Sequence, residues 1–290
     1  MRTLLALCCA IAVTGCAIVI NPNDGEVRYS SDSGGKSVEG NHQFGRDERP
    51  VSSATALDID KLNWVDARVD VRVGPSPSLV IEADSNLLPL IRSEVSGNTL
   101  RIWSDSNIRR SSVIHIIYTT PRLNKIDITS GGRLVVSGFN GDDLRLTQRG
   151  SLYSELSGKV ERLDIANNGS GTVNAVALSS ANSDAVQNGS GRINLGQVRG
   201  ERINVALNGS GNISASGAVQ RLAANINGSG DINFAQLQSQ VAYLTTNGSG
   251  DIDATATAEV NARSSGSGRI TVHGDPARRT VSGSRVNVVR

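Results

Sequence analysis

The chain has 290 residues, of which 31 are glycine and only 3% are aromatic, and its formal net charge is +2. This near-neutral balance argues against a general nucleic-acid binder, which needs a marked basic excess. All three cysteines lie in the first sixteen residues, which excludes a disulfide framework or a cysteine-based metal site in the rest of the chain.

The N-terminus has the pattern of a bacterial lipoprotein signal. Residues 1–15 combine a positive start with an apolar stretch, as a secretory signal peptide does. Val13-Thr14-Gly15-Cys16 resembles a lipobox, which implies that Cys16 becomes the lipidated first residue of the mature protein. Ala17 after the cysteine implies, by the same resemblance, sorting to the outer membrane. Ordinary cleavage and a retained anchor are the alternatives. A retained anchor fits poorly, because a spanning helix needs about 20 apolar residues and Leu4–Ile20 is only marginal.

The segment after the signal is predicted to be a flexible tether. The tether is expected to cover 16–50, and residues 21–50 are rich in Asn, Ser, Gly and charged residues, so they cannot bury enough apolar surface to offset ordering. A random coil of this length spans about 30 Å. Gly35-Lys36-Ser37 ends like a P-loop, but position 30 is Ser where the motif needs Gly, so no nucleotide site is predicted.

From residue 51 onward apolar and polar residues alternate, which is typical of half-buried strands. The strands predicted for residues 51–128 are centred on Leu57–Ile59, Val69–Val73, Leu79–Glu82, Leu100–Ile102, Val113–Ile117 and Ile126–Ile128. Turn-forming residues such as Gly74-Pro75 separate them. One short helical turn is predicted within 86–95, and no other helix.

One tetrapeptide, Asn-Gly-Ser-Gly, organises the second half of the chain. It occurs at 168–171, 188–191, 208–211, 227–230 and 247–250, and Ser-Gly-Ser-Gly follows at 265–268. The steps between copies are 20, 20, 19, 20 and 18 residues. A glycine turn that recurs at such a period is typical of β-solenoids.

Alignment of the copies on this turn produces apolar columns separated by a polar one. Two places after the turn lie Val173, Ile193, Ile213, Ile232, Ile252 and Ile270; four places after it lie Ala175, Leu195, Ala215, Phe234, Ala254 and Val272. A period of two predicts that these residues face inward from a short strand. A further apolar column before the turn, with Ile165 and Leu244, makes the turn a corner between two strands.

Two all-β architectures fit this spacing: a β-solenoid with repeats of about 20 residues, or an antiparallel meander or sandwich. Asn-Gly is also a strong hairpin signal. In a meander, however, equivalent residues lie two strands apart, at about 9.6 Å. In a solenoid they stack at about 4.8 Å, close enough for identical Asn side chains to form a hydrogen-bonded ladder. Five asparagines at one corner position therefore favour the solenoid.

The strands and repeats together resemble the head GIN domain family, which is described as auto-transporter adhesin heads. The resemblance lies in Ala56–Ile59 and Ser78–Pro89, and in Ser190–Asn194 and Ser229–Asn233 of the repeats. It covers about residues 51–272. It implies a right-handed β-helix-like fold outside the cytoplasm and no established catalytic residue.

Motifs that would indicate catalysis or metal binding are missing from the sequence. There is no Gly-x-Ser-x-Gly elbow and no His-Glu-x-x-His. A calcium β-roll would need Asp two places after the turn, where Val and Ile stand here. His115 lies in an apolar strand and is interpreted as structural. No cofactor and no metal site is predicted.

The strongest candidate for a surface site is the column that directly follows the turn. Asp231 and Asp251 are predicted to be adjacent on stacked coils, with Arg192 and Arg269 in the same column. Paired carboxylates could serve acid–base chemistry or a metal. A solvated edge in which the arginines offset the acids fits the residues better, because surface pairs of this kind contribute little.

We therefore expect residues 51–290 to form one β domain, with N-terminal strands in 51–128, coils in 129–272 and a basic C-terminal cap in 273–290. The expected function is non-catalytic: an outer-membrane lipoprotein that is held by its lipid anchor and binds a surface glycan or an envelope protein. A polysaccharide-active enzyme on a β-helix, or a purely structural envelope protein, are the alternatives. The sequence does not indicate the oligomeric state.

Overall fold

The computed structural model describes residues 17–20, 27–30, 37–62, 67–109 and 111–290. The chain divides into two units, Met1–Ser37 and Val38–Arg290. In the first unit, strands β1 (Ala17–Ile20) and β2 (Val27–Ser30) pair antiparallel. Cys16 and the predicted signal peptide lie outside the described residues.

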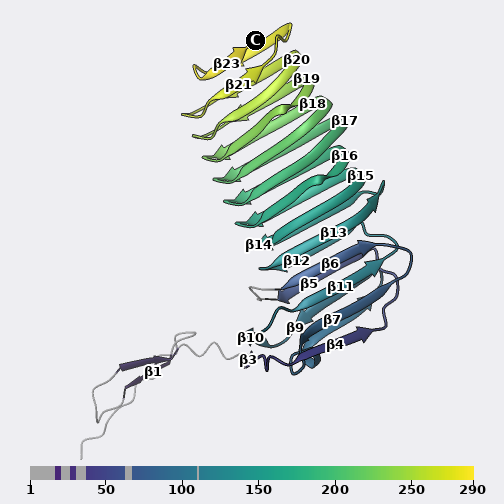
Figure 1. Ribbon diagram of the computed structural model, residues 1–290. Coiled ribbons are helices and arrows are strands. Elements are labelled where there is room, and N and C mark those ends of the chain that lie inside the picture. Colours follow the sequence, from purple (N-terminus) through teal and green to yellow (C-terminus); the bar gives the residue numbers. More distant parts are fainter. Residues whose placement is uncertain (1–16, 21–26, 31–36, 63–66, 110) are drawn as a thin grey trace, which may run out of the picture. The chain divides into compact units, whose positions relative to one another are not determined.

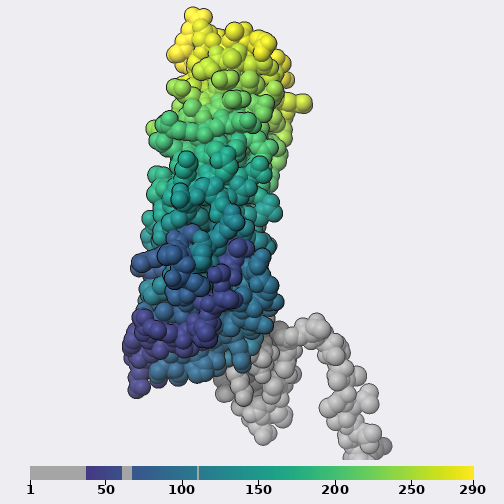
Figure 2. Space-filling view, turned by 90° about the vertical axis from the view of Figure 1, so that its right-hand side faces the viewer, coloured from purple at the N-terminus to yellow at the C-terminus, as the bar shows by residue number. Residues whose placement is uncertain are grey.

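The second unit is an extended stack of strands, which Figure 1 shows running from the purple N-terminal strands to the yellow C-terminal ones. In Figure 2 the same order of colours follows the length of this unit. Its first part contains β3 (Ser37–Glu39), β4 (Phe44–Arg49), β5 (Ala56–Leu62), β6 (Arg68–Val73), β7 (Ser78–Asp84), β8 (Ile91–Ser96), β9 (Thr99–Ser104), β10 (Asn107–Arg109), β11 (His115–Thr120) and β12 (Lys125–Ser130). The stack continues with β13 (Arg133–Asn140), β14 (Leu144–Gly150), β15 (Tyr153–Gly169), β16 (Thr172–Gly189), β17 (Arg192–Gly209), β18 (Asn212–Gly228), β19 (Asp231–Thr246), β20 (Ile252–Ser264), β21 (Ile270–His273), β22 (Arg278–Ser282) and β23 (Val286–Val289).

The repeat region is a β-solenoid, as predicted, and the meander alternative is wrong. Each of β15–β19 is one coil with two legs, which we call the post-turn leg and the pre-turn leg. Successive coils pair in parallel, and equivalent residues of the repeats face one another: Ile193 pairs with Ile213, and Asn208 with Asn227. About eight such turns form the solenoid.

The core lies between the two legs of each coil. The two apolar columns after the turn are buried along their whole length, from Val173 and Ala175 at one end to Ile270 and Val272 at the other. The column before the turn, from Ile165 to Leu244, is buried as well. Because burial of one such side chain stabilises the fold by about 1.5–3 kcal/mol, these stacked columns are the main source of stability.

The asparagines of the Asn-Gly-Ser-Gly turns form the expected ladder. Each side-chain amide donates to the carboxamide oxygen of the preceding coil, at 2.6 Å from Asn188 to Asn168, 2.8 Å from Asn208 to Asn188, 3.0 Å from Asn227 to Asn208 and 3.1 Å from Asn247 to Asn227. The ladder fixes the register of the coils at this corner.

Buried polar side chains close the inside of several corners, a feature that the apolar columns did not predict. The Asn167 Nδ2 donates to Gly171 O at 2.8 Å and to Gln187 Oε1 at 2.7 Å. Thr246 Oγ1 donates to Gly250 O at 2.9 Å in a later turn. The bonds to Gly171 O and Gly250 O join a side chain before the turn to a carbonyl four residues later, so they hold the turn closed from within. The bond from Asn167 to Gln187 links two successive coils.

The first part of the unit combines parallel and antiparallel pairs. β11 pairs in parallel with β6 and antiparallel with β7, and β4 adds antiparallel to β7. The tether was expected to end at residue 50, but Phe44–Arg49 already forms strand β4. This segment is hydrogen-bonded to β7 although its sequence carries little apolar surface. The predicted helical turn is a 3-10 turn at Leu88–Leu90, and β8 takes the rest of that segment.

The C-terminal segment extends the stack by part of a coil. β22 pairs with β20, and β23 pairs with β21, both in parallel. Two of the basic residues here are neutralised: Arg278 bonds to Glu259 at 2.9 Å, and Arg279 bonds to Asp275. No helix in the described part of the chain is long and apolar enough to cross a membrane.

Candidate functional site

The predicted candidates Asp231 and Asp251 are neighbours on consecutive coils. The Asp251 backbone N–H donates to Asp231 Oδ1 at 3.0 Å, and the Arg269 N–H donates to Asp251 Oδ1 at 2.7 Å. Arg192 lies two coils before Asp231 in the same column. Within the described residues no ion pair joins these arginines to the two acids, so each carboxylate serves as an acceptor for the coil that follows it.

The same outward column continues into the first part of the unit, where charged side chains contact one another in a series. His115 Nε2 lies 2.7 Å from Asp70 Oδ2, and His115 Nδ1 lies 3.3 Å from Glu82 Oε2. Arg68 Nε donates to Asp70 at 2.9 Å, and Arg46 Nη1 donates to Glu82 at 2.7 Å. The histidine that sequence analysis interpreted as structural is thus held between two carboxylates.

The Asp70 carboxyl has a pKa below its ordinary value. Partial burial by itself raises this pKa, but the hydrogen bonds from His115 and Arg68 favour the charged form and outweigh it. A cavity of about 440 Å³ lies over these charged side chains, and His42, Phe44 and Val113 also line it. Its charged groups are largely engaged with one another, which leaves few of them to recognise a ligand.

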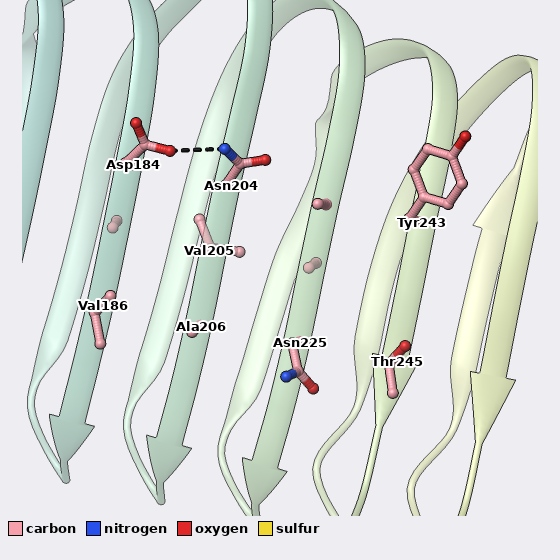
Figure 3. A pocket seen from close by; sticks show the side chains of 11 residues that line it. Asp184, Val186, Asn204, Val205, Ala206, Asn225, Tyr243 and Thr245 are labelled. Atoms are coloured by element: carbon pink, nitrogen blue, oxygen red, sulfur yellow. Dashed lines mark hydrogen bonds between the residues drawn. The ribbon is translucent and has the colours of Figure 1, made fainter.

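A second hollow, of about 360 Å³, lies on the outward face of the pre-turn legs of β16–β19. We call it the groove (Figure 3). Its lining residues are Asp184, Ala185, Val186, Asn204, Val205, Ala206, Ala223, Ala224, Asn225, Tyr243 and Thr245. Within the described residues, no group of three or more His, Cys, Asp or Glu side chains could hold a metal ion, here or elsewhere.

The groove exists because small side chains stand between larger ones in two neighbouring columns. Parallel pairing places Asp184, Asn204, Ala223 and Tyr243 side by side on four consecutive coils. Val186, Ala206, Asn225 and Thr245 form the adjoining column. The alanines leave a depression between the polar end and the ring of Tyr243. This depression spans three strand spacings, or about 14 Å.

The two ends of the groove have different chemistry. At one end the Asp184 carboxylate accepts a hydrogen bond from Asn204 Nδ2 at 2.7 Å (Figure 3). It also accepts one from Arg202 Nη2 at 2.9 Å. At the other end the Tyr243 side chain is prominent on the surface, and the residue is 49% exposed. Between them, Asn225 Oδ1 is buried and has no hydrogen-bond partner in the described part of the chain.

This arrangement is suited to binding. An exposed aromatic ring, an apolar floor and a few planar amides can hold a ligand with both apolar and hydroxylated surfaces. The carboxylate of the groove is already neutralised by Arg202, and it has no second acid beside it as a hydrolytic pair would need. The groove therefore resembles a recognition surface more than an active centre.

Sequence comparison places the chain in a family. The model of the family described as "Putative auto-transporter adhesin, head GIN domain" matches residues 65–197 and 176–276, which is most of the chain. The chain belongs to this family. The resemblance inferred from the strand and turn sequences is thus confirmed. Among curated protein sequences the chain has no significant match.

Three solved structures of similar fold come from Parabacteroides species. A "Putative lipid binding protein" from Parabacteroides distasonis is 24% identical, with a TM-score of 0.65 over 88% of this chain and 100% of its own. A "putative adhesin" from Parabacteroides merdae is 17% identical, with a TM-score of 0.64 over 88% of this chain and 99% of its own. A second "putative adhesin" from P. distasonis is 19% identical, with a TM-score of 0.62 over 88% and 100%. At these identities the similarity establishes the fold.

Sequence analysis missed the groove residues because it aligned only the outward residues that follow the turn. The signal was present: the same alignment extended to the outward positions before the turn brings Asp184, Asn204, Ala223 and Tyr243 into one column. In this column the large aromatic Tyr243 follows the small Ala223, and this change in side-chain size distinguishes the site in the sequence.

Proposed function

We propose that the protein is a non-catalytic, lipid-anchored adhesin head of the cell envelope, and that its groove binds a glycan. The observation that carries the glycan assignment is the exposed Tyr243 ring beside a floor of alanines, flanked by Asn225 and Asn204. A pyranose ring has an apolar C–H face that stacks on such an aromatic ring. Its hydroxyl groups match the donor and acceptor pairs of planar amides.

The solenoid supports this proposal because it holds the groove on rigid elements. Every residue of the groove lies on a strand that is paired on both sides, and its backbone is therefore fixed before a ligand arrives. A preformed site loses little conformational entropy on binding. Membership of a family described as adhesin heads supports the same function.

The experiment is binding of the purified Val38–Arg290 unit to an array of glycans, with Tyr243→Ala as the test variant. Phe44→Ala is a matched control, because Phe44 is 76% exposed and lies outside the groove. We expect Tyr243→Ala to lose about tenfold in affinity, which corresponds to about 1.4 kcal/mol and lies near the upper end of what stacking on an aromatic ring contributes. Loss in the Phe44 variant but not in the Tyr243 variant would refute the groove as the site. Binding of an envelope protein without any glycan would refute the glycan assignment.

The anchor is tested separately. Cys16→Ser in the full chain is expected to abolish incorporation of labelled palmitate and to release the protein from the membrane fraction into the soluble fraction. Retention of label in this variant would contradict lipidation at Cys16. Accessibility of the head to protease in intact cells then distinguishes a surface-exposed protein from a periplasmic one.

A further inference from the structure

The two columns that form the groove are bordered by arginines without acidic partners. Arg221 lies two residues before Ala223 on β18, and Arg263 on β20 pairs with Thr245 of the groove. Both side chains are exposed. Within the described residues neither arginine forms an ion pair, and Arg263 Nε donates to Ser265 Oγ at 3.3 Å.

These two arginines stand at equal offsets from Tyr243. Arg221 pairs with Val241, two residues before Tyr243 on β19, and Arg263 pairs with Thr245, two residues after it. Each arginine is thus one strand and two residues away from the ring, which corresponds to about 8 Å between Cα atoms on a diagonal. Long side chains span such diagonals. Both guanidinium groups can therefore reach a ligand that is centred on the ring.

Two acids of the same face, Asp184 and Glu259, do not neutralise them, because both carboxylates are already engaged. Asp184 accepts from Arg202 and Asn204, and Glu259 accepts from Arg278 at 2.9 Å and from Asn261 at 3.0 Å. The surroundings of Tyr243 consequently carry two uncompensated positive charges. A guanidinium group offers paired N–H donors that match the two oxygens of a carboxylate or sulfate.

We propose that the groove selects anionic saccharides, with one sugar ring on Tyr243 and its carboxylate or sulfate groups bonded by Arg221 and Arg263. This inference rests on the proposed glycan-binding function and specifies its ligand class. Two cations on opposite sides of the ring fit a chain in which successive acidic sugars project to alternate sides. A neutral glycan would leave both guanidinium groups without a partner.

The test compares a galacturonate trimer, a sulfated galactan oligomer and a neutral galactan trimer by isothermal titration calorimetry. The protein is the Val38–Arg290 unit with Arg221→Gln, Arg263→Gln or Tyr243→Ala. Arg72→Gln is the matched control, because Arg72 is also exposed but lies in β6, outside the groove. We expect at least one anionic oligomer to bind about tenfold more tightly than the neutral one, and each groove arginine variant to lose about tenfold for that oligomer. The two anionic oligomers show which acidic group is preferred.

Each other outcome has a separate meaning. Equal binding of the neutral and anionic trimers, with loss only in Tyr243→Ala, would overturn the anionic selectivity and leave the glycan-binding groove intact. Polyglutamate serves as a fourth probe, an anionic polymer without sugar rings. If it binds as well as the acidic saccharides and Tyr243→Ala has no effect, the attraction is purely electrostatic and the anionic-saccharide proposal is overturned. Binding of none of the three oligomers, on a broad array as well, would refute both proposals.

Discussion

The corner glycine Gly228 offers the sharpest test of the stacked turns. Its φ is +154°, and a Cβ at this position would lie 2.2 Å from Gly209 O and 2.9 Å from Gly209 N and C in the preceding coil. That carbonyl cannot move away cheaply, because it accepts the backbone N–H groups of Ser229 at 2.9 Å and Gly230 at 3.0 Å. Gly228→Ala therefore forces a shift between two hydrogen-bonded coils.

The expected cost is the sum of two effects. A φ in this region, which is nearly restricted to glycine, costs an L-residue about 1–3 kcal/mol. The overpacking against backbone costs about 1–3 kcal/mol. We therefore expect Gly228→Ala to lower the free energy of unfolding by about 2–6 kcal/mol.

Two further variants separate these effects. Gly141 has a φ of +95° and nothing within 4 Å of an added Cβ, so Gly141→Ala should show the conformational cost alone. Gly230 lies outside the left-handed region, but its Cβ would lie 2.1 Å from Gly211 O, so Gly230→Ala should show the steric cost alone.

The assay is urea unfolding followed by circular dichroism, with the denaturant slope checked for each variant because repeat arrays can unfold in parts. A Gly228→Ala variant that is no less stable than Gly141→Ala would refute the reasoning. It would mean that the coils are not as closely stacked at this corner as the ladder requires.

Three other changes follow from the same structure. Asn208→Ala removes two bonds of the exposed asparagine ladder and should lower the free energy of unfolding by about 1 kcal/mol; an unchanged urea midpoint would show that the ladder adds no stability. Phe234→Ala leaves a cavity at a fully buried position in the core and should lower the free energy of unfolding by about 3–5 kcal/mol. A loss under about 1 kcal/mol would contradict the packing there. The lowered pKa of Asp70 means that its charged form stabilises the fold above the unfolded pKa and that this contribution is lost as the pH falls through the folded pKa. Asp70→Asn should therefore destabilise the protein at pH 7 and match the wild type at pH values below the folded pKa, and an equal difference at both pH values would contradict this.

The repeats could be predicted because their information is local and periodic. The inward Ile and Val columns and the corner asparagines specify both the period and the parallel register, and the structure has both. A one-residue slip would turn every apolar side chain outward, so this register is strongly determined.

The first part of the unit was harder to predict because its pairing is non-local. Nothing in the sequence of Phe44–Arg49 indicates a strand, since its stability comes from backbone bonds to β7 and from ion pairs such as Arg46 with Glu82. The charged side chains around His115 likewise come from four strands, β4, β6, β7 and β11, which span residues 44–120. Propensity and alternation cannot reveal such pairings.

The groove shows a third limit on what can be predicted from the sequence. Its columns follow from the repeat, but its depth depends on which neighbours happen to be small. Ala206 and Ala223 are ordinary residues in a strand and become informative only beside Tyr243 on the folded surface. The predicted acids Asp231 and Asp251 were indeed adjacent, yet their role as acceptors for the next coil became visible only with the backbone in place.

The most direct test of the proposed binding face is a crystal structure of the Val38–Arg290 unit with the oligosaccharide that binds most tightly in the calorimetric series. We predict one pyranose ring in van der Waals contact with Tyr243 and acidic groups bonded to Arg221 and Arg263. A saccharide bound at the column of Asp231 and Asp251, or in the cavity over His115, with the groove empty, would contradict it.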